Sequence, residues 1–379
     1  MDSKMFSSPG QKILRDMLSI PTAPFAEHLV VEYVERFCAK HESLKLTCDS
    51  VGNMLIHLRQ GRRKIARPVC VTAHLDHPGF VAHRMLSAKR LQAFWRGGVP
   101  KEYFVGSRVR FWVDKTWVRG RVRSIKTVVS RGQRRAETAS VEVPREIPAG
   151  SIGMWDLPEP KVRNGRVYAR SCDDMAGAAA ILSCINKLVR ARHSCDAYFL
   201  LTRAEEVGFA GAIAATRLRT IPQRCFVVAM DTSSELPHAR MGAGPILRVG
   251  DKTSAFTHAT TAHCHHVAGL LAKKNRSFKH QRKLMDGGTC EASAYGALGF
   301  EATGVCLALG NYHNVDKKRK RIAPEYIDLN DFDNVVAWFV ALARAEHPYT
   351  GRDENLLTLI REVELKNKRL LRTSRRQPR

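Results

Sequence analysis

The sequence lacks any apolar run long enough to cross a lipid bilayer. Its longest apolar stretches, such as residues 335–343, fall far short of the roughly 18 residues that a membrane-spanning helix requires. Residues 1–14 contain no apolar segment of the kind that a secretory signal needs. We therefore expect a cytoplasmic protein that makes no use of a membrane.

Closely spaced cysteine pairs are also absent. Ten cysteines are scattered over 379 residues, and no two of them are separated by two residues. In a chain of this length, such scatter is typical of reduced thiols in a reducing compartment. It offers neither a disulfide framework nor a zinc finger, and the sequence contains no RNA-recognition signature.

Acidic residues are few compared with basic ones. The chain has 36 Asp and Glu against 62 Lys and Arg, which gives a formal net charge of +26. Basic residues concentrate in 101–135 and in 366–379. Such a charge can attract nucleic acid, anionic membrane surfaces or acidic substrates. Because no nucleic-acid motif accompanies it, we expect nucleic acid to bind only non-specifically, through the basic surface.

The sequence does contain two apolar patterns that alternate along the chain, one with the spacing of strands and one with the spacing of helices. Continuous apolar runs predict buried strands, and segments with helical spacing lie between them. The predicted strands are 68–72, 196–202, 225–230 and 302–307, and the predicted helices are 177–190, 210–218, 260–273, 291–298 and 329–345. This alternation predicts an α/β domain with three layers, α/β/α, around a mainly parallel sheet.

The stretch 82–163 has a different texture. Short β-rich runs are separated there by Gly, Pro and charged clusters, which predicts a small all-β domain inserted into the chain. The catalytic domain then comprises residues 1–81 and 164–350. For 351–379 we expect a peripheral helix over 353–364, followed by a disordered basic tail.

Residues that can bind metals or move protons follow the predicted strands. Ligands of open α/β sheets gather at the carboxyl ends of parallel strands. Two histidines and three carboxylates there would suit zinc, cobalt or manganese. The residues in these positions are His74 and Asp76 after the first strand, Glu205 and Glu206 after the second, Asp231 after the third, His313 after the fourth, and Asp173 before the helix 177–190.

Each of these residues also has an ordinary structural interpretation. A histidine such as His74 after a strand is more often structural than a ligand, and Asp173 with Asp174 reads as a helix cap. Glu205 with Glu206 reads as a solvated pair, and 231–234 as a turn. The joint occurrence of all of them in one α/β domain is what favours a metal site.

Several motifs together resemble one known family. They occur in that family's order over about residues 11–350, and the β-rich segment falls where the family carries its dimerisation domain. The chain resembles the glutamyl aminopeptidase and tetrahedral aminopeptidase family of two-metal metallopeptidases. The motifs are AHLDHPGF (73–80), SCDDMAG (171–177), TRAEEVGFAGA (202–212), GPILRVGD (244–251) and GGT (287–289).

The resemblance implies a centre with two divalent metal ions, zinc or cobalt. Asp173 would bridge the two ions. His74 and Asp231 would complete the ligands of one ion, and Glu206 and His313 those of the other. The implied activity is that of an aminopeptidase, a hydrolase that removes N-terminal residues from peptides by means of a metal-activated water.

Two further roles follow from the resemblance. Glu205 would be the general acid and base, and Asp76 would orient the imidazole of His74. The family also implies a homo-oligomer in which the β insertion makes contacts. Departures from the family pattern, such as His77 with Pro78 and Cys290 with Glu291, remove none of the proposed ligands.

Two alternatives stay open at this point. A related two-metal amidohydrolase, such as a carboxypeptidase, a dipeptidase or a deacylase, would share the fold, although such relatives usually carry an α/β insertion. A basic binding protein on an inactive peptidase scaffold would also share it, but that hypothesis predicts missing ligands. The histidines on the predicted helix 260–273 and just before it (258, 263, 265 and 266) are interpreted as structural.

Overall fold

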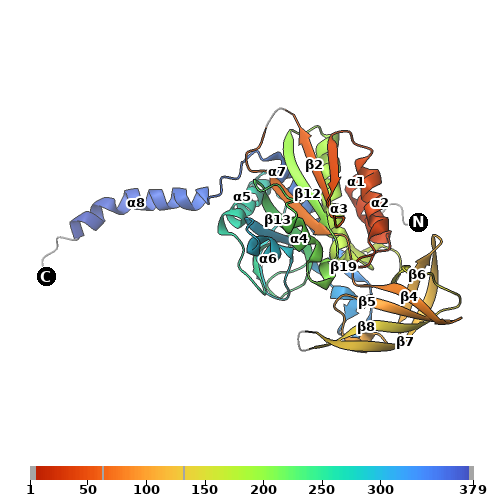
Figure 1. The fold of residues 1–379 in the computed structure, drawn as a ribbon. Coiled ribbons are helices and arrows are strands. Elements are labelled where there is room, and N and C mark those ends of the chain that lie inside the picture. Colours follow the sequence, from red (N-terminus) through yellow and green to blue (C-terminus); the bar gives the residue numbers. More distant parts are fainter. Residues whose placement is uncertain (1–5, 62–63, 131–132, 375–379) are drawn as a thin grey trace.

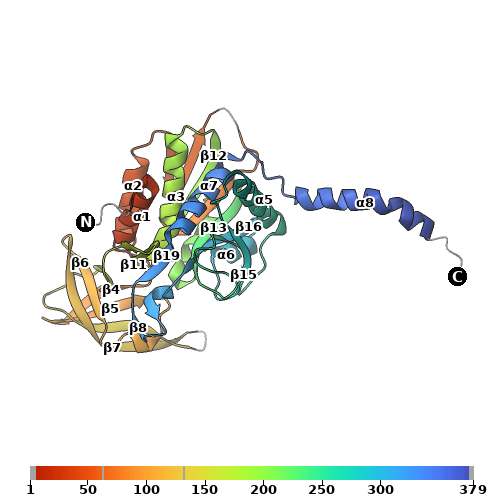
Figure 2. The same cartoon turned by 180° about the vertical axis from the view of Figure 1, so that it is seen from behind.

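The computed structural model describes residues 6–61, 64–130 and 133–374 (Figure 1). It has three visible parts: an α/β body, a β-barrel beside it, and a long C-terminal helix that points away from both (Figures 1 and 2). The candidate site residues named from the sequence lie in the body, at the end that faces the barrel.

An eight-stranded sheet forms the middle layer of the body. Its four inner strands, β12, β3, β13 and β16, are parallel to one another, whereas β1, β2 and β14 join it in antiparallel pairs. In spatial order the strands are β1 (Leu44–Cys48), β2 (Met54–Gln60), β12 (Cys195–Thr202), β3 (Val69–His74), β13 (Phe226–Ser234), β16 (Ala302–Leu309), β14 (Ile246–Asp251) and β15 (Gln281–Met285). The inner strands are almost wholly buried, which explains their unbroken apolar sequences.

Helices cover both faces of this sheet, so the predicted three-layer α/β/α fold is confirmed. Two hydrophobic cores lie on opposite faces of the sheet, and each joins the sheet to its own set of helices. One set is α1 (Pro9–Ser19), α2 (His28–Cys38), α3 (Cys172–Arg190), α5 (His258–Lys274) and α7 (Leu329–Arg344), and the other is α4 (Ala210–Arg217) and α6 (Glu291–Ala297). Helix α3 is the central one, because nearly all of its residues are buried.

The inserted segment folds as a closed barrel with its own core. Its strands are β4 (Gly79–Ser87), β5 (Arg90–Arg96), β6 (Arg108–Val113), β7 (Thr116–Ser130), β8 (Gln133–Glu142) and β9 (Ile152–Trp155), with the short helix η1 (Lys101–Tyr103) after β5. Phe80, Trp95, Phe104 and Trp155 pack edge to face or at a tilt in the barrel core, with ring centroids 4.7–6.2 Å apart. Among the described residues of the barrel, closure leaves no exposed edge strand.

Short sheets connect the two parts. Beyond the barrel, β10 (Lys161–Arg163) pairs with β11 (Arg166–Ala169), and β11 pairs with β19 (Glu325–Asp328) just before α7. A further hairpin joins β17 (Val315–Asp316) to β18 (Arg321–Ile322). The domain limits at residues 82 and 163 remain a prediction.

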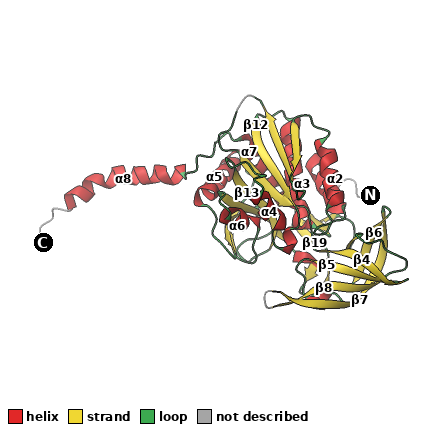
Figure 3. Cartoon of the chain, in the orientation of Figure 1, coloured by secondary structure: helices red, strands yellow, loops and turns green. Residues whose placement is uncertain are grey.

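The C-terminal helix differs from the prediction. Helix α8 runs over Glu354–Ser374, so it extends well beyond the predicted end at residue 364 (Figure 3). Residues 365–372 are all Leu, Lys, Arg or Asn, and no Gly or Pro interrupts the helix. The expectation of a disordered tail is therefore wrong for 365–374, and its remaining residues, 375–379, lie outside the described part. None of the described helices is long and apolar enough to span a membrane.

Candidate metal centre

Parallel strands bring the predicted site residues to one edge of the sheet. Strand β3 ends at His74, and β12 leads into the short helix η2 (Glu205–Val207). Strand β16 leads into the short helix η3 (Tyr312–Asn314), which contains His313. Because these strands are close neighbours in the sheet, their carboxyl ends converge on the start of α3.

Asp231 reaches this edge in a different way from the one predicted. Strand β13 does not end before it but continues to Ser234, and the pairing of β13 with β16 includes residues 231–234. The interpretation of 231–234 as a turn is therefore wrong. Asp231 projects into the site from inside a strand, where the Arg248 guanidinium lies 3.5 Å from its Oδ2.

Asp173 lies at the centre of the group. Its Oδ1 is 3.3 Å from Nε2 of His74, and its Oδ2 is 3.5 Å from Nε2 of His313. The same nitrogen of His74 is 3.7 Å from Oδ1 of Asp231, and that of His313 is 3.1 Å from Oε2 of Glu206. The two oxygens of one carboxylate thus face two separate pairs of candidate ligands.

These separations suit metal ions. Nitrogen and oxygen ligands that lie about 2.0–2.2 Å from a tetrahedral ion are roughly 3.3–3.6 Å from one another. Ligand atoms within 4.8 Å of one another occur in two groups, His74 with Asp173 and Glu206, and His74 with Asp174 and Asp231. In the described structure, Oε1 of Glu206 and Oδ2 of Asp174 are buried without a hydrogen-bond partner, as expected of oxygens that a cation would satisfy.

The electrostatics of the site also require positive charge. Burial raises the pKa of Glu205 well above its ordinary value, and burial raises that of Glu206 to about 7. Burial would lower the pKa of His313, but Glu206 and Asp173 together raise it to about 10. A divalent cation among these carboxylates would favour their ionised forms.

Asp76 contacts both candidate motifs. Its backbone carbonyl accepts a hydrogen bond from Nδ1 of His74 at 3.0 Å, and its carboxylate lies 3.5 Å from the same nitrogen. That carboxylate also accepts the backbone amides of Glu205 and Glu206, at 2.9 and 3.1 Å. Asp76 therefore fixes the position of η2 as well as the ring of His74.

Other residues support the site although the sequence did not single them out. The backbone amide of Asp173 donates to Glu325 at 3.0 Å, and Nδ1 of His77 donates to the backbone carbonyl of Asp173. Burial lowers the pKa of His77 to about 4, so this ring is neutral. Nε2 of His77 lies 3.0 Å from the side chain of Asn314. The signal of Glu325 and His77 in the sequence is weak, because both act on backbone atoms of Asp173, which is far away along the chain.

A cleft of about 820 Å³ leads to these residues. Glu205, Glu206 and His313 line it on the side of the body, and Arg96 and Gly98 line it on the side of the barrel. The backbone carbonyl of Gly98 accepts a hydrogen bond from Nδ1 of His313 at 2.8 Å. The barrel thus forms one wall of the cleft and holds one of the candidate ligands.

The histidines at 258–266 lie elsewhere. They belong to α5, on the far side of the body from the barrel, where His258 pairs with Asp353 at 3.1 Å. The ring of His263 packs against those of Phe226 and Tyr349, with centroids 5.4 and 5.3 Å away.

Comparison with known proteins gives a consistent result. The model of the M42 glutamyl aminopeptidase family matches residues 52–318. A lysyl aminopeptidase of Pyrococcus furiosus is 23% identical over 261 residues, which are 63% of this chain and 73% of that protein.

Solved structures share the fold. An aminopeptidase of the archaeon Desulfurococcus kamchatkensis superposes with a TM-score of 0.71 at 21% identity, covering 88% of this chain and 94% of that one. The TET1 peptidase of Pyrococcus horikoshii superposes with a TM-score of 0.70 at 20% identity, covering 88% and 99%. The family model covers more than half of the chain and confirms the resemblance of the motifs: the chain belongs to the M42 glutamyl aminopeptidase family and is a metal-dependent aminopeptidase.

Proposed function

We propose that this aminopeptidase works with two divalent ions, zinc or cobalt, held by five side chains. His74 and Asp231 ligate one ion, Glu206 and His313 ligate the other, and Asp173 bridges them. The arrangement of Asp173 carries this proposal, because its two carboxylate oxygens face His74 on one side and His313 on the other, at 3.3 and 3.5 Å. Asp174 is near enough to His74 and Asp231 to support the first ion.

Glu205 is the proposed general base and acid. Its side chain is 11% exposed at the bottom of the cleft, with Oε2 3.9 Å from Nε2 of His74. Bound ions would lower the pKa of a water molecule and polarise the scissile carbonyl. Glu205 then accepts a proton from the attacking water and donates it to the nitrogen of the leaving peptide. Asp76 holds the backbone of Glu205 in the position that this transfer requires.

The substrates that we propose are peptides with a free N-terminus. The cleft between body and barrel is large enough for several residues of an extended peptide, and carboxylates at its closed end suit a positively charged α-amino group. A carboxypeptidase would place a carboxylate there and a deacylase a blocked amine, whereas a dipeptidase would require room for only two residues. Family membership and this charge both favour the aminopeptidase.

Assembly and location belong to the same proposal. The TET1 peptidase of Pyrococcus horikoshii can assemble into a tetrahedron or a large octahedral shell. We propose that this chain also forms a homo-oligomer, with the barrel at a contact between copies. All ten cysteines are free, which supports a reducing compartment such as the cytoplasm.

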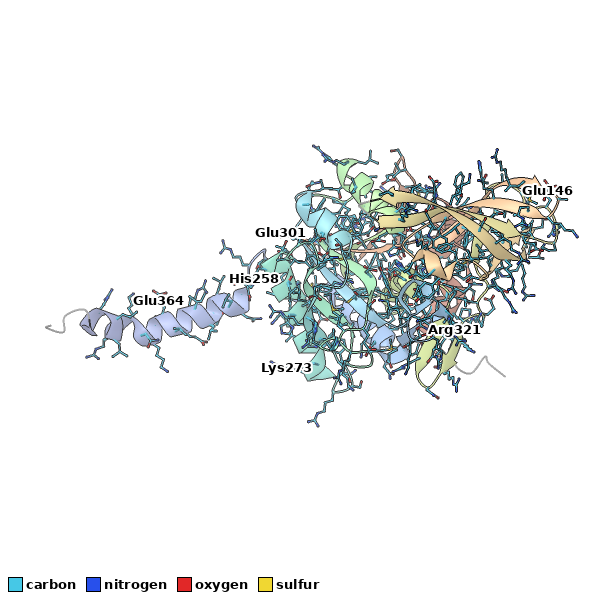
Figure 4. The ribbon with its side chains drawn as sticks, turned by 90° about the horizontal axis from the view of Figure 1, so that it is seen from below. Glu146, His258, Lys273, Glu301, Arg321 and Glu364 are labelled. Atoms are coloured by element: carbon cyan, nitrogen blue, oxygen red, sulfur yellow. The ribbon has the colours of Figure 1, made fainter. Side chains whose placement is uncertain are left out.

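The experiment is a panel of aminoacyl chromogenic substrates, assayed with apo protein, with added zinc or cobalt, and with the Glu205→Gln variant. We expect activity that depends on metal and falls by about 10²–10⁴-fold in Glu205→Gln, because the variant loses proton transfer but keeps its shape. Glu146→Gln is the matched control, since Glu146 is exposed on the barrel (Figure 4) and should retain full activity.

Other outcomes would overturn parts of the proposal. Full activity of Glu205→Gln would remove Glu205 from the chemistry. One bound ion per chain at saturation, measured by elemental analysis, would contradict the bridging role of Asp173. Activity on N-blocked peptides, with none on free N-termini, would favour the deacylase alternative.

A further inference from the structure

Helix α8 carries apolar side chains that the rest of the described chain leaves exposed. Leu356, Ile360 and Val363 are 41%, 50% and 52% exposed. Beyond its first turn, the helix stands clear of the α/β body and of the barrel, and Glu364 lies on that part of it (Figure 4). In its first turn, the side chain of Asn355 lies 2.9 Å from Nδ1 of His266 in α5, but the apolar side chains named above stay exposed to solvent. A helix of 21 residues with so little tertiary packing gains little stability from it, so another source of stability is required.

The spacing of these side chains identifies that source. Leu356, Ile360, Val363 and Asn367 follow one another at intervals of four, three and four residues, and Leu370 continues the series in the sequence. This is the spacing of the inner positions of a coiled coil. With Ile360 and Asn367 at position a of the heptad, Leu356, Val363 and Leu370 fall at position d.

On these grounds we infer that α8 pairs with α8 of a second copy of this chain in a parallel, two-stranded coiled coil. Ile360 at a, with Leu356 and Leu370 at d, follows the preference for two parallel strands, and Val363 is the β-branched residue among the d positions. Asn367 supports the same choice, because a single asparagine at a fixes the register and the number of strands. Only the parallel, in-register pairing places the side-chain amide of Asn367 opposite that of Asn367 on the other helix. In an antiparallel pairing, the amide would be buried against an apolar d residue of the other helix.

The charges beside the seam are compatible with this pairing. In the parallel register, position g faces position e of the next heptad on the other helix. Leu359 then faces Glu364, and Lys366 faces Leu371, so no like charges oppose each other across the seam. Lys368 and Arg372, at positions b and f, point away from the second helix. The net positive charge of the helix is thus kept out of the contact.

A membrane surface is a weaker match for the same helix. Interfacial helices typically carry Lys or Arg on the polar face and Trp, Phe or Leu on the apolar face. Helix α8 has no aromatic residue, and Glu354, Glu362 and Glu364 are spread along it. The coiled coil goes beyond the proposed function and does not depend on the metal centre.

The test uses the full chain and two matched substitutions. Ile360→Glu places a charge in the seam, whereas Leu365→Glu makes the same kind of change at position f, where Leu365 is 75% exposed. Sedimentation equilibrium should show self-association weakened about tenfold or more by Ile360→Glu and unchanged by Leu365→Glu, because only the former buries a charge. Circular dichroism of both variants checks that the folded body is retained.

Disulfide trapping tests the orientation, even if other surfaces also hold copies together. Asn367→Cys in a Cys48→Ser background should form a disulfide between two chains under mild oxidation, and Leu365→Cys should not. The inference would be overturned if both glutamate variants self-associated as strongly as the parent chain and Asn367→Cys formed no disulfide between chains. A flotation assay with anionic phosphatidylserine vesicles tests the lipid alternative. If the chain floats with the vesicles, and Ile360→Glu and Leu365→Glu weaken this binding equally, the coiled coil is overturned in favour of a lipid surface.

Discussion

Asp76 shows how one buried carboxylate can hold two parts of a site together. It lies just beyond the end of β3, and it contacts His74 on its own strand end and the backbone of η2 on the neighbouring one. The two amides that it accepts belong to Glu205 and Glu206, the proposed base and a proposed ligand. Asp76 therefore positions the base, a ligand and the imidazole relative to one another.

This geometry predicts the effect of Asp76→Asn. The amide keeps the size of the side chain, but its NH₂ group cannot accept the backbone amides of both Glu205 and Glu206. We expect kcat and metal affinity to fall by about 10–100-fold each, as for other residues that support metal ligands. Isothermal titration with zinc and steady-state kinetics measure the two effects. Asp286→Asn, at an exposed position, is the control; equal behaviour of both variants would contradict the role of Asp76.

His263 predicts a dependence of stability on pH. Burial first, and then the neighbouring His266 and His347, lower the pKa of this ring to about 4. Between about pH 4 and 6.5 the unfolded chain binds a proton that the folded chain does not, so folding becomes less favourable as the pH falls through this range. Because the ring is only partly buried, we expect a loss of about 1–2 kcal/mol between pH 7 and 5.

The variant His263→Phe should remove this part of the pH dependence. Phenylalanine keeps the aromatic packing against Phe226 and Tyr349 and cannot be protonated. Thermal unfolding at pH 7 and pH 5 should show a smaller difference for His263→Phe than for the parent chain. His28→Phe, at an exposed histidine, should leave the difference as it was; an unchanged difference in His263→Phe would refute the assignment.

At the residue scale, the sequence pointed to the residues that the structure brings together, but, apart from Asp76, not to those that support them. His74, Asp173 and Glu206 lie in motifs at strand ends, where the residue type and the position give the same signal. Glu325 and His77 act on the backbone of Asp173, from 152 and 96 residues away. Contacts of this kind leave no periodic or local pattern, so one sequence cannot reveal them.

At the level of elements, the segment after β5 links the barrel to the metal centre. Gly97 has a φ of +121°, and a Cβ atom there would lie 2.7 Å from Pro78. Gly98, the next residue, accepts the hydrogen bond from His313. The conformation that only glycine adopts easily at 97 therefore places the carbonyl that orients a candidate ligand.

Gly97→Ala should disrupt the contact between the barrel segment at Gly98 and His313. We expect the barrel and the body to remain folded, while the carbonyl of Gly98 moves away from His313 and zinc affinity falls by about 10-fold or more. Titration calorimetry measures the affinity, and circular dichroism the fold. Gly106→Ala is a control, because this glycine also has a positive φ but has open space around its Cβ position. An equal loss of affinity in both variants would argue against the coupling.

Element boundaries were predictable where the local sequence decides them. The inner strands and α7 agree with prediction to within a few residues, since long apolar runs specify them. The extension of β13 through Asp231 could not be predicted, because the pairing of residues 231–234 with β16 stabilises a sequence that favours a turn. The length of α8 was underestimated because its basic second half was interpreted as a frayed end.

At the scale of the whole molecule, the buried carboxylates of the site affect stability. Asp173, Asp174, Glu205 and Glu206 are grouped at one end of the sheet with few cations beside them. Removal of the proposed ions with a chelator should therefore lower the melting temperature, and zinc at 100 times its dissociation constant should restore about 2.7 kcal/mol per ion. Differential scanning calorimetry measures the change.

Asp173→Asn serves as the control for this prediction. The variant lacks the charge of the bridging carboxylate, so added zinc should stabilise it much less than the parent chain. An identical melting temperature before and after chelation, with removal of the metal verified by elemental analysis, would contradict the stabilising role of the ions.

The order of the central sheet has a consequence for aggregation. Strands β1 and β15 lie at its two edges, where unpaired backbone groups could accept a strand from another molecule and start a fibril. Lys45 in β1 and Arg282 in β15 point outward there, exposed. In-register pairing of either edge with the same strand of a second copy would place like charges side by side. The basic residues at the two edges thus disfavour the edge-to-edge addition of strands from other copies.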